Sequence, residues 1–208
     1  SKHFHIILAF PNTYYANLEA KGRFENNAAV TKEVALMMDP SADPFAAPAP
    51  DADAPIERFG AKDANDLSWA NLLNAYTCTE CGRCTSECPA NLTGKKLSPR
   101  KIMMDTRDRI EEIGQNIATN GSFLDDGKSL LGDYITNEEL WACTSCNACV
   151  QACPVDIDPL NIIMKLRNFA TMEESSAPGA LNAMMTNVEN NGAPWPFNQM
   201  DRANWINE

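Results

Sequence analysis

One cysteine pattern occurs twice in this chain and uses every cysteine that the chain has. The eight positions are Cys78, Cys81, Cys84 and Cys88 in the first copy and Cys143, Cys146, Cys149 and Cys153 in the second. A proline follows the last cysteine of each copy, so both copies read C-x2-C-x2-C-x3-C-P. No other set of residues in the sequence is a candidate metal site of comparable strength. The fold has to be built around these two motifs.

This spacing is typical of bacterial chains with two iron-sulfur clusters, in which the three closely spaced cysteines bind one cluster and the fourth binds the other. We therefore expect two [4Fe-4S] clusters with crossed ligand sets. The first cluster is expected to take Cys78, Cys81, Cys84 and Cys153, and the second is expected to take Cys143, Cys146, Cys149 and Cys88. Motifs joined in this way must lie side by side, and loss of the clusters is expected to unfold the region.

Disulfide bonds and structural zinc are the two competing interpretations of these cysteines. Disulfide frameworks are typical of short secreted chains, and this sequence shows no secretory signal. Zinc sites usually separate their cysteine pairs by a loop and often recruit histidine, whereas His3 and His5 are remote from both motifs. A duplicated four-cysteine run with proline after each last cysteine favours clusters over both. We assign the two histidines no ligand role.

Helical signals surround the motifs. Ser98 can cap a helix that has Pro99 at its first position and that is expected to run to Ile113, before Gly114. A capping box, Thr136-Asn-Glu-Glu139, predicts a short helix that ends at Cys143, and Asp158-Pro159 predicts another helix start. A helix before the first motif is indicated by the apolar residues Leu67, Trp69, Leu72, Leu73 and Tyr76. The expected fold is therefore mainly α.

Several segments resemble iron-sulfur proteins of the heterodisulfide reductase C type, and the iron-sulfur subunits of glycolate oxidase and anaerobic glycerol-3-phosphate dehydrogenase are similar. The segments are Trp69, Leu72-Leu73, Cys78-Thr-Glu-Cys81-Gly-Arg-Cys84, Cys88-Pro-Ala, Thr93-Gly-Lys, Leu97-Ser-Pro-Arg100, Glu139-Leu-Trp-Ala-Cys143-Thr-Ser-Cys146 and Cys153-Pro-Val. The resemblance covers about Asp66 to Glu208. It implies an α-helical ferredoxin-type domain that holds two [4Fe-4S] clusters, with extended N- and C-terminal arms.

Both ends of the chain carry shorter resemblances. The first twelve residues are similar to the sequence after the last transmembrane helix of membrane iron-sulfur proteins with a nitrate reductase gamma-like cytochrome b region. The tail around Trp195 and Trp205 is similar to a segment that precedes a domain with CCG repeats, although an ordinary polar terminus is the alternative. We expect three parts: an N-terminal arm and linker at 1–63, the two-cluster domain at 64–175 and a docking tail at 176–208.

Charge is concentrated outside the expected cluster domain. The formal net charge is -11, and the segments Asp39 to Glu57 and Thr171 to Glu208 carry most of it. The first of these segments is rich in Pro, Ala and Asp, which favours a linker over a packed element. No basic patch or glycine-rich phosphate loop is present, so nucleic acid is not expected as a partner. The cations Lys95, Lys96 and Arg100 are interpreted as a solvated helix entrance.

Complete thiolate sets leave no open coordination site, so we expect the clusters to pass single electrons and assign no catalytic residue. The resemblance implies a wire between a CCG-domain or flavoprotein redox subunit and a membrane quinone or cytochrome b module, in a hetero-oligomer. The expected location is cytoplasmic, at the face of the inner membrane. Two alternatives stay open: part of a soluble heterodisulfide or hydroxyacid oxidoreductase whose catalytic module lies elsewhere, and a purely structural cluster protein.

Overall fold

The computed structural model describes residues 3–20, 22–24, 26–39 and 58–206. The described residues form helices, turns and loops, and their one strand-like contact is an isolated bridge between Leu131 and Ile135. They divide into two compact units, residues 1–173 and residues 174–208. The prediction of a mainly α fold is confirmed. Most of the expected acidic linker, residues 40–57, lies outside the described residues.

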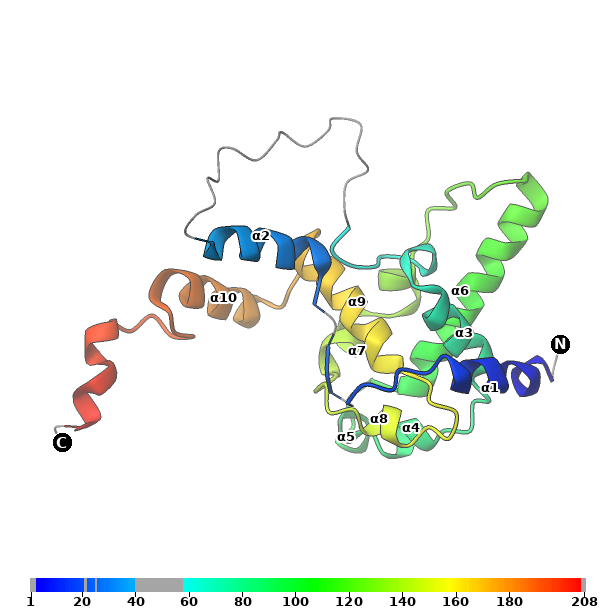
Figure 1. Cartoon of the computed structure of the whole chain (residues 1–208), viewed down its shortest axis with the longest axis horizontal. Helices are drawn as coiled ribbons and strands as arrows, with labels where there is room; N and C mark the ends of the chain where they lie inside the picture. The colour runs from blue at the N-terminus through cyan, green and yellow to red at the C-terminus, as the bar shows by residue number, and fades with distance from the viewer. Residues whose placement is uncertain (1–2, 21, 25, 40–57, 207–208) are drawn as a thin grey trace. The chain divides into compact units, whose positions relative to one another are not determined.

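The first unit contains the helices that surround the cysteine motifs (Figure 1). In chain order they are α1 (Phe4–Tyr14), α2 (Ala28–Met38), η1 (Ala64–Asp66), α3 (Trp69–Thr77), α4 (Arg83–Ser86), α5 (Pro89–Leu92), α6 (Pro99–Asn120), the irregular segment η2 (Leu130–Tyr134), α7 (Asn137–Ala142), α8 (Ala148–Gln151) and α9 (Pro159–Met172). One helix precedes each motif, a short helix lies inside it, and a long helix that begins at a proline follows it. The helical pattern therefore repeats together with the cysteines.

Side-chain caps fix where these helices begin. Ser98 Oγ accepts from the N–H of Lys101 at the start of α6, and Asp158 Oδ1 accepts from the N–H of Asn161 at the start of α9. Thr136 and Glu139 form the predicted capping box of α7. Such caps satisfy N–H groups that have no partner inside the helix. The three predicted helix starts are confirmed.

The length of α6 differs from the prediction. Gly114 does not end the helix, which continues to Asn120. The helix stops at Gly121, whose φ of 81° is left-handed and whose N–H donates to the carbonyl of Ile117 at 2.8 Å. Glycine inside a helix weakens it by only about 1 kcal/mol, so a long helix can include one. The terminating signal was the later glycine.

The core of the first unit lies between the two long helices and the shorter ones packed against them. Equivalent positions of α6 and α9 face this core, because Ile102 and Met103 match Ile162 and Ile163 when the two helices are aligned at their first proline. All four side chains are buried. Further core residues come from the other elements: Ala75, Leu97, Leu130, Ile135, Leu140, Leu160 and Leu166. The core therefore holds both motifs from one side.

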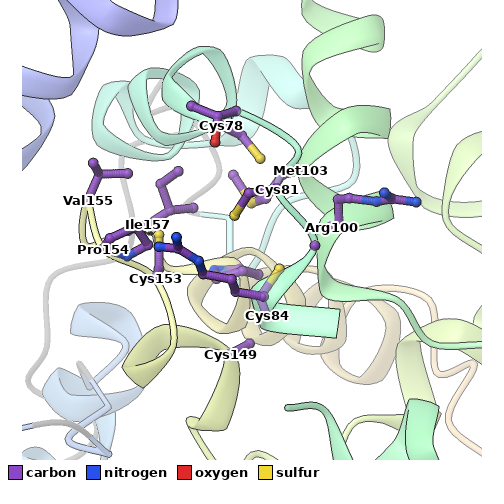
Figure 2. A pocket seen from close by; sticks show the side chains of 14 residues that line it. Cys78, Cys81, Cys84, Arg100, Met103, Cys149, Cys153, Pro154, Val155 and Ile157 are labelled. Carbon is purple, nitrogen blue, oxygen red and sulfur yellow. Dashed lines mark hydrogen bonds between the residues drawn. The ribbon is translucent and has the colours of Figure 1, made fainter. Parts of the chain in front are cut away.

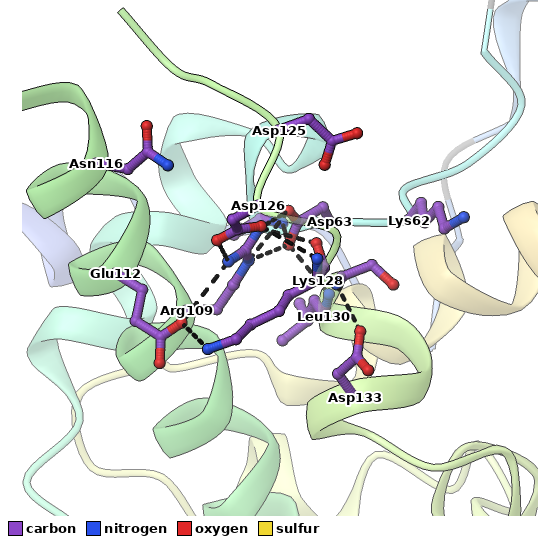
Figure 3. A network of polar contacts seen from close by, with 12 residues as sticks. Lys62, Asp63, Arg109, Glu112, Asn116, Asp125, Asp126, Lys128, Leu130 and Asp133 are labelled. Carbon is purple, nitrogen blue, oxygen red and sulfur yellow. Dashed lines mark hydrogen bonds and ion pairs between the residues drawn. The ribbon is translucent and has the colours of Figure 1, made fainter. Parts of the chain in front are cut away.

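A buried arginine joins three segments of this unit (Figure 3). The side chain of Arg109, on α6, is 0% exposed and forms ion pairs with Asp63 at 2.7 Å and Asp126 at 2.6 Å. It also donates to the carbonyl of Lys128 at 2.9 Å. Asp63 in turn caps η1 and accepts from the N–H of Leu130. The segment that enters the domain is thus tied to α6 and to the loop before η2.

The second unit contains α10 (Gly179–Asn191) and the 3-10 helix η3 (Gln199–Ile206). Helix α10 ends at Gly192, which has a left-handed φ of 64°. Trp195 and Trp205 are both exposed in this unit. In neither unit do the described residues include a helix with the length and apolar character that crossing a membrane requires. The three-part division expected from the sequence stays a prediction.

Candidate functional site

The first cysteine of each motif lies directly after a helix. Cys78 is the C-cap residue of α3 and Cys143 is the C-cap residue of α7, and both have extended backbone angles. The chain therefore leaves the helix at the cysteine and turns the next residues around it. Burial of the flanking helices in the core fixes the position of both thiols. The sequence predicted this arrangement for Cys143 from the capping box and for Cys78 from the apolar run before it.

The two motifs also repeat an uncommon backbone conformation. Glu80 and Ser145, at matched positions, have left-handed φ values of 59° and 57°. Gly82 and Asn147, also matched, have φ values of 83° and 60° and precede the short helices α4 and α8. Residues other than glycine pay roughly 1–2 kcal/mol for this conformation, and such strain clusters at functional sites. It lets successive cysteines of one motif turn toward a common point.

Contacts between α4 and α8 bring the two motifs side by side. The fourth cysteines lie after these helices. Cys88 is buried and precedes Pro89 at the start of α5, while Cys153 is partly buried and precedes Pro154. The proline at each position cannot donate a backbone hydrogen bond, so the chain turns away after the thiol.

Two cavities lie among the cysteines. The first has a volume of about 90 Å³ and is shown in Figure 2. Its sulfur-bearing lining residues include Cys78, Cys81, Cys84, Cys149 and Cys153. The second is smaller, about 20 Å³, and its sulfur-bearing lining residues are Cys88, Cys143, Cys146 and Cys149. Cys149 lines both, so the cavities are neighbours.

The donor set fits iron-sulfur clusters. All eight cysteines are free thiols, and all eight line one or other cavity. The first cavity is several times larger than the space that one water needs, so it can hold a group larger than a single ion. The second cavity is close to one water in size, and the exposed Cys146 at its edge can change rotamer to enlarge it.

Burial raises the thiol pKa at these sites. It raises the pKa of Cys149 to about 12, and it raises the pKa of Cys78, Cys84 and Cys143. A buried thiolate without a positive partner is costly, so these groups become thiolates only when they bind a cation such as iron. The chemistry of the site therefore matches metal ligands better than isolated thiols.

Backbone N–H groups and arginines act in the opposite direction. The N–H of Ser145 donates to Sγ of Cys143 and the N–H of Ile157 donates to Sγ of Cys153, each at 3.4 Å. After burial, the pKa of Cys143 is influenced by this N–H and then by the charge of Arg167, both of which lower it. Hydrogen bonds to ligand sulfurs tune the reduction potential of a cluster.

A contact from the N-terminal helix reaches the first cavity. Asn12, on α1, is 2% exposed and donates from Nδ2 to the carbonyl of Val155 at 2.7 Å. Val155 lines the first cavity. Helix α1 packs on α3, where the rings of Tyr15 and Trp69 meet edge to face with centroids 5.0 Å apart. The sequence carried no signal for this contact, because it joins residues at opposite ends of the first unit.

The cations near the helix entrance have separate roles. Arg100 lines the first cavity and, in Figure 2, extends away from the cysteines. Lys96 pairs with Glu138 at 2.6 Å, and both side chains are more than half exposed. The predicted solvated entrance is consistent with these positions. Arg107 and Arg167, which approach the motifs more closely, were not singled out from the sequence as site residues.

Comparison with known proteins identifies the region that holds the cavities. Residues 77–157 match the family described as 4Fe-4S dicluster domain. This match, together with the eight cysteines, confirms the prediction of two [4Fe-4S] clusters. The part of the chain that carries them is an iron-sulfur electron-transfer domain of the kind found in oxidoreductases.

Three relatives extend the similarity beyond this domain. "Probable iron-sulfur-binding oxidoreductase FadF" of Bacillus subtilis is 30% identical over 237 residues, covering 100% of this chain and 30% of the relative. "EtfAB:quinone oxidoreductase" of Syntrophomonas wolfei is 31% identical over 171 residues, covering 73% and 24%. The "Probable membrane-anchored ferredoxin" of Chromohalobacter salexigens is 32% identical over 170 residues, covering 74% and 25%. The chain thus spans less than a third of each of these relatives.

More distant similarity reaches the heterodisulfide reductases, as the sequence motifs suggested. The C-type polypeptide of the ferredoxin/F(420)H(2)-dependent CoB-CoM heterodisulfide reductase of Methanosarcina acetivorans is 31% identical over 109 residues. The match covers 52% of this chain and 54% of the relative. The resemblance to the heterodisulfide reductase C type is therefore confirmed as a distant one.

Proposed function

We propose that this chain is the electron-wire part of a larger oxidoreductase and that it binds its two clusters through crossed ligand sets. Cys78, Cys81, Cys84 and Cys153 bind the first cluster. Cys143, Cys146, Cys149 and Cys88 bind the second cluster. The grouping of cysteines around the two cavities supports this proposal, because each proposed set lines one cavity completely. Cys149 is the one member that also reaches the other cavity.

The adjacency of the cavities is the observation that carries the wire function. Because Cys149 lines both, an electron that arrives at one cluster has a short path to the other. Each proposed ligand set also contains one exposed cysteine, Cys81 in the first and Cys146 in the second. Each cluster therefore has an edge near solvent where a redox partner can exchange electrons with it.

The proposed partners are a CCG-domain or flavoprotein redox subunit on one side and a membrane quinone or cytochrome b module on the other. The names of the relatives support this, since one is a quinone oxidoreductase and another belongs to a heterodisulfide reductase. We place the hetero-oligomer at the cytoplasmic face of the inner membrane. Its docking tail contains Trp195 and Trp205, whose exposed indoles resemble the aromatic anchors of protein interfaces.

Anaerobic purification of the native complex from detergent-solubilised membranes tests the proposal. Iron analysis, EPR at stepped potentials and mass spectrometry of the co-purifying chains are the measurements. Two interacting [4Fe-4S] signals together with a quinone or haem chain and a CCG or flavin chain are expected. A soluble complex without those membrane components favours a heterodisulfide or hydroxyacid oxidoreductase instead. Clusters that cannot be reduced make the domain structural, and zinc in place of iron overturns the proposal.

A further inference from the structure

The helices that follow the two motifs carry an arginine at the same position. Arg107 stands eight residues after Pro99, the first residue of α6, and Arg167 stands eight residues after Pro159, the first residue of α9. Each side chain reaches back to the cysteine motif that precedes its own helix. The repeat that places the cysteines therefore also places one guanidinium beside each motif.

The two arginines meet different residues at the matched position of the motif. Arg107 Nη2 lies 2.6 Å from Oε1 of Glu80. Arg167 Nη1 lies 3.4 Å from Oγ of Ser145, which has the place in the second motif that Glu80 has in the first. Both motif residues have the same left-handed backbone conformation. The arginine is thus repeated, but its carboxylate partner is not.

Arg167 is held by neutral acceptors. Its Nη2 donates to the carbonyls of Leu140 at 2.7 Å and Cys143 at 2.6 Å, and its Nε donates to the same Leu140 carbonyl at 3.1 Å. The guanidinium also lies 4.9 Å from the ring centroid of Trp141. Within the part of the chain that the structure describes, this partly buried group makes no ion pair with a carboxylate. Because a guanidinium stays protonated, its positive charge remains beside the second motif.

A fixed charge beside a cluster changes its reduction potential. Reduction adds one electron to the cluster, so a nearby positive charge stabilises the reduced form and raises the potential. At the first motif the carboxylate of Glu80 offsets the charge of Arg107. Arg83 and Arg100, which line the first cavity, are exposed, so water and salt screen their charge. The matched pair at the second motif has no such offset.

We propose that Arg167 positions and tunes the second site: it fixes the backbone at Cys143 and raises the reduction potential of the cluster bound there. Glu80 cancels the equivalent effect of Arg107 at the first site. This inference rests on the proposed function, because it requires one cluster at each motif. It concerns a single electron entering each cluster, with no bond made or broken and no further reactant.

The test compares midpoint potentials from EPR-monitored titrations of the whole complex. Arg167→Gln is expected to lower the second potential by an amount equal to about a tenfold change in the reduction equilibrium, or about 59 mV for one electron. Arg167→Lys keeps the charge and is expected to leave that potential close to the wild-type value. The matched control is the double variant Glu80→Gln with Arg107→Gln, which removes a neutral pair and is expected to shift the first potential much less.

A reciprocal exchange keeps the test decisive even if Arg167→Gln does not assemble its cluster. Ser145→Glu supplies the second motif with the carboxylate of the first and leaves the carbonyl contacts of Arg167 in place, so the second potential is expected to fall. Glu80→Ser is expected to raise the first potential. Unchanged potentials in assembled Ser145→Glu and Glu80→Ser overturn the inference, as does an equal shift of both clusters in either variant. A wild-type protein without two [4Fe-4S] clusters by iron content and EPR instead overturns the proposed function.

Discussion

Arg109 grips Asp63 with two of its nitrogens across 46 positions of sequence, with Nε–Oδ1 and Nη2–Oδ2 distances of 2.9 and 2.7 Å. The same guanidinium binds both carboxylate oxygens of Asp126. One buried cation is therefore shared by two acidic residues from separate segments. Because the arginine is inaccessible to water, neither carboxylate has a replacement partner of equal strength.

Arg109→Ala is expected to destabilise the first unit by about 3–5 kcal/mol, since removing one partner of a buried ion pair leaves the others uncompensated. For a unit of this size that corresponds to a fall in Tm on the order of 10 °C. The control is Arg23→Ala, which removes a pair with Glu19 whose side chains are 69% and 61% exposed. Exposed pairs contribute about 0–1 kcal/mol. Calorimetry of the cluster-loaded variants measures both, and equal Tm values contradict the account.

Acid is expected to weaken the same network. Hydrogen bonding from Arg109 lowers the pKa of Asp126 to about 2, below the unfolded value of about 3.9. The unfolded chain therefore binds more protons between these values, so stability rises with pH there. The contribution is complete above about pH 4 and is lost as the pH falls to about 2. Asp126→Asn is expected to flatten the pH dependence of Tm in this window, and an unaltered slope counts against it.

Gly60 is expected to tolerate no side chain. A Cβ at this position lies 2.2 Å from the backbone nitrogen of Phe169 and 2.5 Å from the carbonyl oxygen of Lys165. Gly60→Ala therefore has to push the entering segment off α9, at a cost of about 1–3 kcal/mol or more. Gly114→Ala is the matched control, because a Cβ there meets nothing within 4 Å. It is expected to stabilise α6 by about 0.5–1 kcal/mol, and denaturant midpoints that move in the same direction refute the contrast.

Removal of iron is expected to release the motif helices first. Helices α4 and α8 have only 4 residues each, too few to persist without tertiary support. Chelation under reducing conditions should therefore abolish their hydrogen-exchange protection, while α6, with 22 residues and a buried face, keeps more of its own. Mass spectrometry of peptides from the treated protein resolves the two cases. Unchanged protection in α4 and α8 would show that the clusters do not hold the motifs.

Local signals in the sequence predicted much of this molecule. The cap at Ser98, the capping box at Thr136 and the helix start at Asp158 each depend on residues three positions apart, so the sequence displays them directly. The cysteine spacing predicted the cofactor for the same reason. The length of α6 was misjudged, because Gly114 is solvent-facing and the helix continues past it.

Contacts between distant segments could not be predicted. Arg109 meets Asp63 and Asn12 meets Val155 only after the helices have packed, and no periodicity links such positions. The arginine repeated on α6 and α9 was visible in principle, because aligning the sequence at Pro99 and Pro159 matches Arg107 with Arg167. Its meaning depended on Glu80 and Ser145, whose places beside these side chains only the structure provides.

The crossed ligand sets are the central claim, and the fourth cysteines test them most directly. Cys81→Ser and Cys146→Ser serve as references, since each alters the EPR signal of the cluster that its own motif binds. Cys153→Ser is then expected to alter the signal that Cys81→Ser alters, and Cys88→Ser the signal that Cys146→Ser alters. If Cys153→Ser instead changes the signal that Cys146→Ser changes, each motif binds its own cluster with all four cysteines and the crossed assignment is wrong.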